Sequence, residues 1–206
     1  MQHCNNSIEK VIHISKIILA SGSPRRASLL DQLGISYERI VPDVDESVYG
    51  NLPPSEQVTS LSRAKAVAVL SKGSEYPVVA ADTLVCLDHT VLGKPADREN
   101  AFNMLRALSG RWHQVYTGIT VAAGEIINTG FEVTNVKFRE LTDGEINGYI
   151  ATGEPMDKAG AYGIQGKGAL LVERIEGDFY NVMGLPLVRL WVMLKELGVR
   201  LGEGIF

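Results

Sequence analysis

The chain has 206 residues with 20 basic and 24 acidic side chains, which gives a net charge of −4 at pH 7. Hydrophobic residues make up 45% of the chain and charged residues 21%, a balance typical of a globular protein with a substantial core. The negative charge argues against a broad nucleic-acid-binding surface, and no apolar stretch is long enough to span a membrane. Cys4 and Cys86 are too few for a disulfide framework or a zinc site, so we expect a cytoplasmic protein.

Strand-like and helix-like patterns alternate along the chain without a linker or an internal repeat. Residues 1–16 lack the apolar core of a signal peptide and are expected to form a polar leader, followed by one domain over residues 17–206. Glycine-rich joints near residues 50 and 124 are candidate boundaries between two lobes around a cleft. Hairpins among helix-connected strands predict an α/β fold with a mixed sheet. The predicted elements, in chain order, are a strand at 17–20, a helix at 24–33, a strand at 37–41, a helix at 57–72, strands at 78–87 and 90–92, a helix after Asp97, strands at 114–123 and 126–138, a helix after Thr142, a glycine-rich segment at 153–168, strands at 169–175 and up to Val182, and a helix at 186–197.

The segment from Ser21 to Arg26 joins the first predicted strand to the first predicted helix. Ser23 suits the N-cap, and Pro24 suits the first helical position. Free N–H groups at a helix N-terminus favour an anion, and the guanidinium groups of Arg25 and Arg26 match phosphate oxygens. The segment therefore predicts a phosphate site, with an ordinary strand–helix connection as the alternative.

A carboxylate, Asp82, stands within the apolar strand predicted over residues 78–87. Burying it is costly unless it is paired, hydrogen-bonded or bound to a metal, which favours a functional role over that of an aspartate capping a strand end. In a regular strand Thr83 would point to the opposite face. A bulge or a strand end is then needed to bring both side chains to one site.

Two lysines stand where a cleft could use them. Lys65 falls on the apolar face of the helix predicted over residues 57–72, where it either extends to the rim or directs its ammonium group into a cleft. Lys94 follows the predicted hairpin in a Gly-Lys pair that lacks the spacing of a P-loop. Any nucleotide site here is consequently not of the P-loop type.

An acidic turn precedes the helix that carries Lys65. Its members Asp43, Asp45 and Glu46 form either a solvated surface turn or part of a cation site. Because Mg²⁺ commonly takes one or two carboxylates together with phosphate oxygens and waters, the turn could hold an ion with Asp82 and a bound triphosphate.

The glycine-rich segment contains a polar side chain that could recognise a base. Gln165 carries an amide that both donates and accepts hydrogen bonds, which suits the edge of a pyrimidine base. A flexible surface loop is the alternative, although a long loop without function is unusual in a compact domain. Asn181 and the helix entry at 184–186 are candidates for the pocket wall. Ser21 and Ser23 lack a base, so a serine hydrolase is not expected.

Taken together, these segments resemble the Maf family of nucleoside triphosphate pyrophosphatases. The matches follow the order of the family and extend from Ile17 to the last helix: Ser21–Arg26, Ala81–Thr83, Gly93–Pro95, Asp157–Gly166 and Gly184–Pro186. The resemblance implies a Maf/Ham1-like fold, in which an elongated mixed β-sheet flanked by helices forms two lobes around a nucleotide cleft.

The resemblance also implies a reaction, the hydrolysis of a nucleoside triphosphate to the monophosphate and pyrophosphate. Arg25, Thr83 and Gln165 stand at the specificity positions, as in the branch that acts on dTTP and UTP, whereas the branch acting on methylated GTP carries Trp, Gln and Glu. By analogy Asp82 is the catalytic base that activates water. The implied phosphate-binding residues are Ser21, Ser23, Arg25, Arg26, Lys65 and Lys94, and the implied ligands of a Mg²⁺ or Mn²⁺ ion are Asp82 with Glu46 or Asp45.

The expected role is the house-cleaning of nucleotide pools, with modified uridine triphosphates as further candidate substrates. We expect no nucleic-acid or membrane partner and leave a homodimer open. One alternative is a non-catalytic nucleotide-sensing regulator of cell division, which needs the pocket but not Asp82. Another is a pyrophosphatase for purine or methylated GTP substrates.

Overall fold

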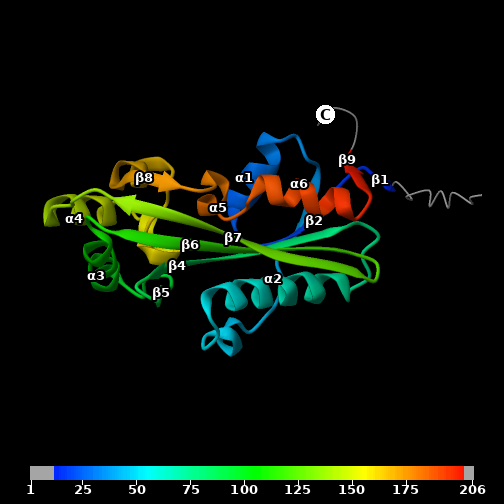
Figure 1. Ribbon diagram of the computed structural model, residues 1–206, viewed down its shortest axis with the longest axis horizontal. Helices are drawn as coiled ribbons and strands as arrows, with labels where there is room; N and C mark the ends of the chain where they lie inside the picture. The colour runs from blue at the N-terminus through cyan, green and yellow to red at the C-terminus, as the bar shows by residue number, and fades with distance from the viewer. Residues whose placement is uncertain (1–11, 202–206) are drawn as a thin grey trace, which may run out of the picture.

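The computed structural model describes residues 12–201, which form an elongated α/β molecule built on long strands (Figure 1). The strands are β1 (Ile12–Ile14), β2 (Ile17–Ala20), β3 (Tyr37–Ile40), β4 (Val78–Leu87), β5 (Thr90–Leu92), β6 (Trp112–Ala123), β7 (Ile126–Phe138), β8 (Val172–Glu176) and β9 (Val199–Leu201). The helices are α1 (Pro24–Gln32), α2 (Pro54–Leu70), α3 (Arg98–Leu108), α4 (Asp143–Ala151), α5 (Phe179–Met183) and α6 (Leu187–Glu196). Short 3₁₀ helices lie at η1 (Glu46–Tyr49), η2 (Glu154–Asp157), η3 (Ala159–Ala161) and η4 (Gly166–Leu171).

The main sheet is mixed, as predicted. Its strand order is β3-β2-β4-β6-β7-β8, and β5 pairs with β4 beside this path. The β2–β3 and β2–β4 pairs are parallel, whereas the remaining pairs in this sheet are antiparallel. Among the described residues, no helix combines the length and hydropathy needed to cross a bilayer.

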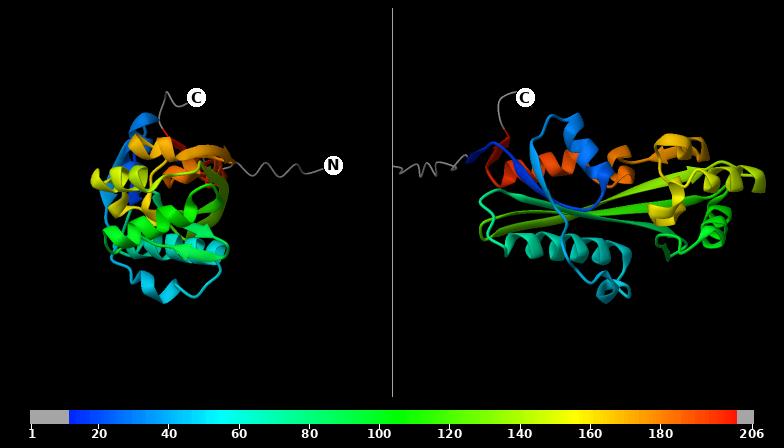
Figure 2. Two further views of the ribbon diagram at one scale, coloured as in Figure 1. Left: turned by 90° about the vertical axis from the view of Figure 1, so that its left-hand side faces the viewer. Right: turned by 180° about the vertical axis from the view of Figure 1, so that it is seen from behind.

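Helices cover both faces of the sheet and divide the core into two lobes along the strands. In one lobe α1 and α6 pack on one face, and α2 packs on the other, as the views in Figure 2 show. In the second lobe α3 and α4 pack together against the far ends of β4, β6 and β7. The long strands run through both lobes, so they hold the two ends of the molecule in a fixed relation.

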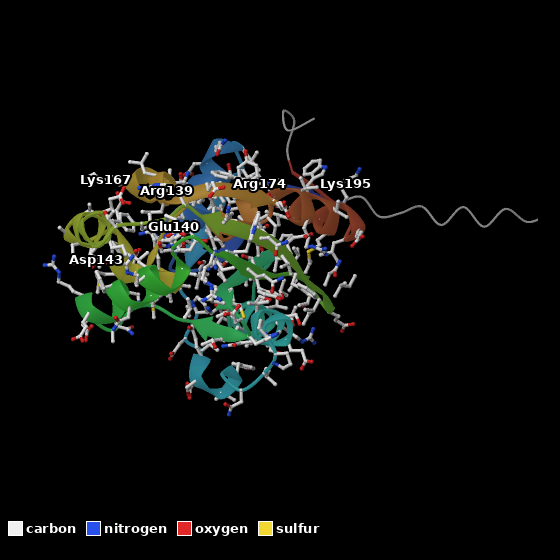
Figure 3. All side chains as sticks on the ribbon, turned by 60° about the vertical axis from the view of Figure 1, so that its left-hand side comes forward. Arg139, Glu140, Asp143, Lys167, Arg174 and Lys195 are labelled. Atoms are coloured by element: carbon white, nitrogen blue, oxygen red, sulfur yellow. The ribbon has the colours of Figure 1, made fainter. Side chains whose placement is uncertain are left out.

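The helix start signals in the sequence are confirmed where polar caps are made. Thr142 and Glu145 form the predicted capping box at the start of α4, and the Arg139 guanidinium donates to Glu145 at 2.7 Å. Figure 3 labels Arg139 and Asp143, the first residue of α4, at the same end of the molecule. Asp97 likewise caps α3 by accepting from the backbone N–H of Asn100.

Several predicted boundaries are wrong. Helix α2 begins at Pro54 rather than Gln57, because Pro54 itself occupies a first-turn position. The strand predicted over 169–175 begins only at Val172, since η4 takes the residues before it. The short strand predicted up to Val182 is the helix α5, which is capped by Asp178 at its start and ended by Gly184 in the left-handed region.

The ends of the chain carry two strands that the sequence pattern did not indicate. β1 lies within the segment predicted as a leader and pairs in parallel with β9. Residues 1–11 of that leader, including Cys4, lie outside the described residues, so the boundary at residue 17 stays a prediction. Cys86, on β4, is buried with a free thiol.

The edge of β4 has an opening that places the functional side chains. β4 pairs with β2 over Val78–Ala80 and with β5 over Val85–Leu87. In the described part of the chain, residues 81–84 have no strand on this side. The pairing with β6 on the other side continues in step through Asp82 and Thr83, so the strand has no bulge there. Because the edge is open, side chains from both faces of β4 reach the same space.

Helix α2 comes unusually close to the sheet at Gly118 of β6, which is the register partner of Asp82. A Cβ atom on Gly118 would lie 2.1 Å from the backbone oxygen of Val58. Only glycine allows this backbone-to-backbone approach. The absence of one side chain therefore sets the height of α2 above β4 at the level of Asp82.

We predict that Gly118→Ala lowers the free energy of unfolding by about 1–3 kcal/mol, because the new methyl group meets rigid backbone. The control is Gly148→Ala in α4, where an added Cβ meets nothing within 4 Å. It should raise stability by about 0.5–1 kcal/mol through helix propensity. Urea denaturation measures both values, and an unchanged stability for Gly118→Ala would contradict the close approach.

Candidate active site

A cavity of about 690 Å³ lies where the two lobes meet, beside the open edge of β4. Its size is within the usual range for small-molecule sites. The segments that line it are far apart in the sequence: the β2–α1 loop, η1, α2, β4, the segment after β5, the η2–η4 region and the loop after α5. The predicted site residues that reach the cavity are Ser21, Ser23, Arg25, Arg26, Glu46, Lys65, Asp82, Thr83, Lys94 and Gln165.

The centre of the cavity is an ion-pair cluster formed by Lys65 and two carboxylates. The Lys65 Nζ lies 2.6 Å from Asp82 Oδ1 and 2.6 Å from Glu46 Oε1. The side chains of Lys65 and Asp82 are 12% and 11% exposed, so these two charges are largely removed from water. Of the two orientations that the sequence left open for Lys65, the structure shows the one in which its ammonium group is directed into the cleft.

Asp82 and Thr83 both face the cavity although they lie on opposite faces of a regular strand. Asp82 meets α2 on one face, and Thr83 meets α1 on the other. Neither the bulge nor the strand end that we expected is present, and the uncovered edge of β4 brings the two side chains to one site instead.

Arg26 is buried beneath the β2–α1 loop and donates hydrogen bonds to three separate segments. Its Nε donates to the backbone oxygen of Gly184 at 2.7 Å, its Nη1 to Ser21 Oγ at 3.0 Å and its Nη2 to Thr83 Oγ1 at 3.0 Å. Burial lowers the pKa of the guanidinium, and the nearby charge of Asp82 opposes that shift. Arg26 therefore joins α1, β4 and the α5–α6 connection, while its predicted role as a phosphate contact stays a prediction.

The loop that Arg26 supports is also held from its outer side. The Ser21 hydroxyl accepts from the Ser23 backbone N–H at 3.1 Å, and Ser23 makes no side-chain cap to α1. Arg39, on β3, donates to the backbone oxygens of Ser21 and Gly22. Arg39 could not be predicted as a support of this loop, because nothing in the local sequence of β3 shows that the two segments meet.

Thr83 is the surface end of a buried polar chain. Its hydroxyl oxygen lies 3.0 Å from that of Thr117, and Thr117 donates to the backbone oxygen of Asn181 at 2.9 Å. The Asn181 amide donates to Val115 and Thr134 and is fully buried. The sequence suggested that Asn181 lines the cavity wall. Asn181 is instead buried beneath the cavity, where it supports the strands.

Cationic and amide groups on the rim remain open to solvent. Arg25 Nη1 lies 3.5 Å from Asp157 Oδ2, a distance typical of a loose ion pair. The exposed Lys94 ammonium makes no hydrogen bond or ion pair with any described residue. The exposed Gln165 amide also makes none within the described ranges. These three groups are placed to meet a ligand without first breaking strong contacts.

The wall behind Gln165 is held by a buried His113–Tyr162 pair. A ring nitrogen of His113 lies 2.7 Å from the Tyr162 hydroxyl, and both rings stack edge-on with Phe138. Burial lowers the pKa of His113 to about 4, so this ring is neutral at physiological pH. No local pattern gives His113 a role, since its partner Tyr162 is distant in the chain.

The described residues contain no group of three or more His, Cys, Asp or Glu side chains that could hold a metal ion. Two carboxylates, those of Asp82 and Glu46, converge on one ammonium group. A Mg²⁺ ion bound to phosphate oxygens commonly takes one or two carboxylates, so this pair suits such an ion. Asp45 is not brought to them. Its Oδ1 caps η1 by accepting from the Ser47 backbone and hydroxyl, and the hydroxyl bond lowers the pKa of Asp45.

The two arginines should respond differently to truncation. Arg26→Ala removes three hydrogen bonds, two of them buried, and should lower the free energy of unfolding by about 1.5–3 kcal/mol. Arg25→Ala removes one loose rim contact, so its stability should change by about 0.5 kcal/mol or less, while calorimetry should show weaker binding of inorganic tripolyphosphate. Equal losses of stability, or unchanged anion binding for Arg25→Ala, would contradict the division of roles.

Comparison with known proteins gives consistent matches over nearly the whole chain. The family model described as Maf-like protein matches residues 16–197. A protein of Acetivibrio thermocellus called dTTP/UTP pyrophosphatase is 52% identical over 193 residues, which cover 89% of this chain and 96% of that protein. Proteins of the same name from Caldicellulosiruptor bescii and Bacillus thuringiensis are 49% and 48% identical, over 93% and 89% of this chain and 99% and 96% of their own lengths. A solved HAM1 protein from Coxiella burnetii is 18% identical, with a TM-score of 0.49 over 89% of this chain and all of its own. On the family model and the close relatives, the chain belongs to the Maf family.

Proposed function

We propose that this chain hydrolyses dTTP and UTP to the nucleoside monophosphate and pyrophosphate, and thereby removes these nucleotides from the cellular pool. Relatives that share about half of its sequence over nearly their full lengths carry the name dTTP/UTP pyrophosphatase. The observation that carries the proposal is the Asp82–Lys65–Glu46 cluster, which places a buried carboxylate inside a cavity with cationic rim residues.

The rim cations provide the charge that a triphosphate needs. Arg25 and Lys94 lie on the cavity wall, and the N-terminal end of α1 lies beside them. Guanidinium forks, an ammonium group and free helix N–H groups all favour phosphate oxygens. We assign these groups to holding the β- and γ-phosphates, so that the bond to the α-phosphate lies towards Asp82.

Asp82 is the proposed base. Its carboxylate takes a proton from water as the water oxygen attacks the α-phosphorus, and pyrophosphate leaves with the bridging oxygen. Lys65 contacts Asp82 in the ligand-free protein and is long enough to turn towards a phosphate oxygen. The developing negative charge then stays close to its ammonium group in a site largely shielded from water.

Asp82 and Glu46 would hold a Mg²⁺ or Mn²⁺ ion together with phosphate oxygens. The ion, when bound, supplies positive charge that stabilises the pentacovalent phosphorus and the departing pyrophosphate. Of the sequence-predicted ligands, Asp45 is the one that the fold directs elsewhere, towards Ser47.

Gln165 is the proposed reader of the pyrimidine. The Gln165 amide can donate to a carbonyl oxygen of uracil or thymine and accept from the ring N–H. Thr83 supports this side of the cavity from below, because its hydroxyl is engaged with Arg26 and Thr117. Since the 5-methyl group adds no polar atom, dTTP, UTP and modified uridine triphosphates all remain candidate substrates.

The test is release of pyrophosphate from dTTP, UTP, ATP, GTP and methylated GTP with Mg²⁺ or Mn²⁺. We expect dTTP and UTP to be preferred and Asp82→Asn to lower kcat by about 10²–10⁴ while the fold and nucleotide binding persist. Asp88→Asn is the control, because Asp88 forms an exposed pair with Arg111 and does not line the cavity. It should keep full activity.

Three results would count against the proposal. Preference for a purine or methylated GTP would overturn the assigned substrates but leave the chemistry in place. Near-normal turnover by Asp82→Asn would remove its role as base. Tight nucleotide binding without any pyrophosphate release by the unaltered protein would favour the nucleotide-sensing alternative.

A further inference from the structure

Arg25 lies in the first turn of α1, where its own helix offers no counter-charge. This turn holds no acidic residue, and the neighbouring Arg26 and the positive end of the helix both repel a guanidinium group. Arg25 is half-buried and lines the cavity. Without a partner from another segment, so long a side chain would turn away from the loop and gain rotational freedom in water.

The partner is Asp157 of η2, on the other side of the cavity. Helix α1 belongs to the lobe whose core contains Leu29 and Leu30, whereas Met156, beside Asp157, packs on the core of the second lobe. Arg25 Nη1 lies 3.5 Å from Asp157 Oδ2, and both residues line the cavity. Among the described residues, this is the one ion pair that Arg25 forms.

Lys158 fixes the orientation of the Asp157 carboxylate. Its Nζ lies 2.6 Å from Asp157 Oδ1 and donates to the backbone oxygen of Glu154 at 2.5 Å. Its aliphatic stem lies against Gly163, where an added Cβ would come within 3.0 Å of Lys158 Cε. The Lys158 side chain is accordingly only 16% exposed. One oxygen of Asp157 is therefore held by Lys158, and the other is turned towards Arg25.

The charge of Asp157 is balanced where a triphosphate would approach it. Lys158 and Arg25 lie on its two oxygens, so the three groups together carry one net positive charge. A guanidinium group has five N–H donors in a rigid fork. Arg25 can therefore keep Asp157 on one nitrogen while its other donors meet phosphate oxygens.

We propose that Asp157, held by Lys158, is a positioning residue that directs Arg25 at the phosphates of the bound nucleotide from across the cavity; this rests on the proposed function. Asp157 takes no part in the bond changes. It holds Arg25 in place before the nucleotide arrives, which reduces the side-chain entropy lost on binding. A carboxylate that merely repelled the triphosphate would have the opposite effect, because removing its charge would tighten anion binding.

The experiment measures dTTP kinetics and the calorimetric binding of inorganic tripolyphosphate. The variants are Asp157→Asn, Asp157→Glu, Arg25→Ala and the double variant with Arg25→Ala and Asp157→Asn. Asparagine keeps the size of the side chain and an acceptor for Lys158, so the fold should persist. We expect Asp157→Asn to raise KM for dTTP and Kd for tripolyphosphate about three- to fivefold, as for an exposed ion pair, with kcat within about twofold.

Asp143→Asn is the matched control. The Asp143 side chain is 62% exposed, against 61% for Asp157, and it also pairs with an arginine, Arg106, but neither residue lines the cavity. This variant should keep the KM, kcat and tripolyphosphate affinity of the unaltered protein.

The double variant shows whether Asp157 acts through Arg25. In the Arg25→Ala background, Asp157→Asn should cause no further loss of binding, and Asp157→Glu, which keeps the charge, should bind more tightly than Asp157→Asn. Unchanged or tighter binding by Asp157→Asn would overturn the inference, as would an equal loss with and without Arg25. Failure of the unaltered protein to hydrolyse dTTP would instead reject the proposed function, while tripolyphosphate binding would still decide the role of Asp157.

Discussion

The Lys65–Asp82 ion pair is the interaction on which the site depends. A carboxylate in the middle of an apolar strand would be expelled or protonated without a partner, and an ammonium group on the buried face of a helix has the same problem. Each charge makes the burial of the other tolerable. The pair forms because Gly118 lets α2 lie almost directly on β6, next to the register position of Asp82. Glu46 then adds a second carboxylate from η1, which leaves the cluster with net negative charge ready for a cation or a phosphate-bound metal.

Around this pair the protein separates rigid support from groups that meet the ligand. Arg26, Thr83, Thr117 and Asn181 form a buried hydrogen-bonded chain from α1 through the sheet to α5. Such a chain holds the loop and the strand edge at a fixed distance, which favours catalysis by positioning. Arg25 is half-buried, Lys94 and Gln165 are exposed, and all three are weakly engaged, so they can contact a nucleotide at little cost. The open edge of β4 between β2 and β5 joins these two sets, because a ligand there reaches both faces of one strand.

Much of this arrangement could be predicted from local sequence. Asp82 and Lys65 were predicted as site residues because a charge in an apolar pattern needs a partner. The segment from Ser21 to Arg26 was predicted as a phosphate site because Ser23 and Pro24 begin a helix directly after a strand. The rest depends on contacts between distant segments. No local pattern shows that β2 ends early enough to expose Asp82 and Thr83, or that Arg39 and Asp157 reach the segment from Ser21 to Arg26. Helix α5 was mistaken for a strand because it is one short turn rich in residues that favour strands, and its formation depends on the Asp178 cap.

The central claim is that water, activated at Asp82, attacks the α-phosphorus. Hydrolysis of dTTP in water enriched in ¹⁸O measures this most directly, with mass spectrometry of both products after a single turnover. The account predicts one ¹⁸O atom in thymidine monophosphate and none in pyrophosphate. Label in pyrophosphate would mean attack at the β-phosphorus, and labelled orthophosphate would mean attack at the γ-phosphorus. Either result would contradict the placement of the triphosphate with its α-phosphate at Asp82.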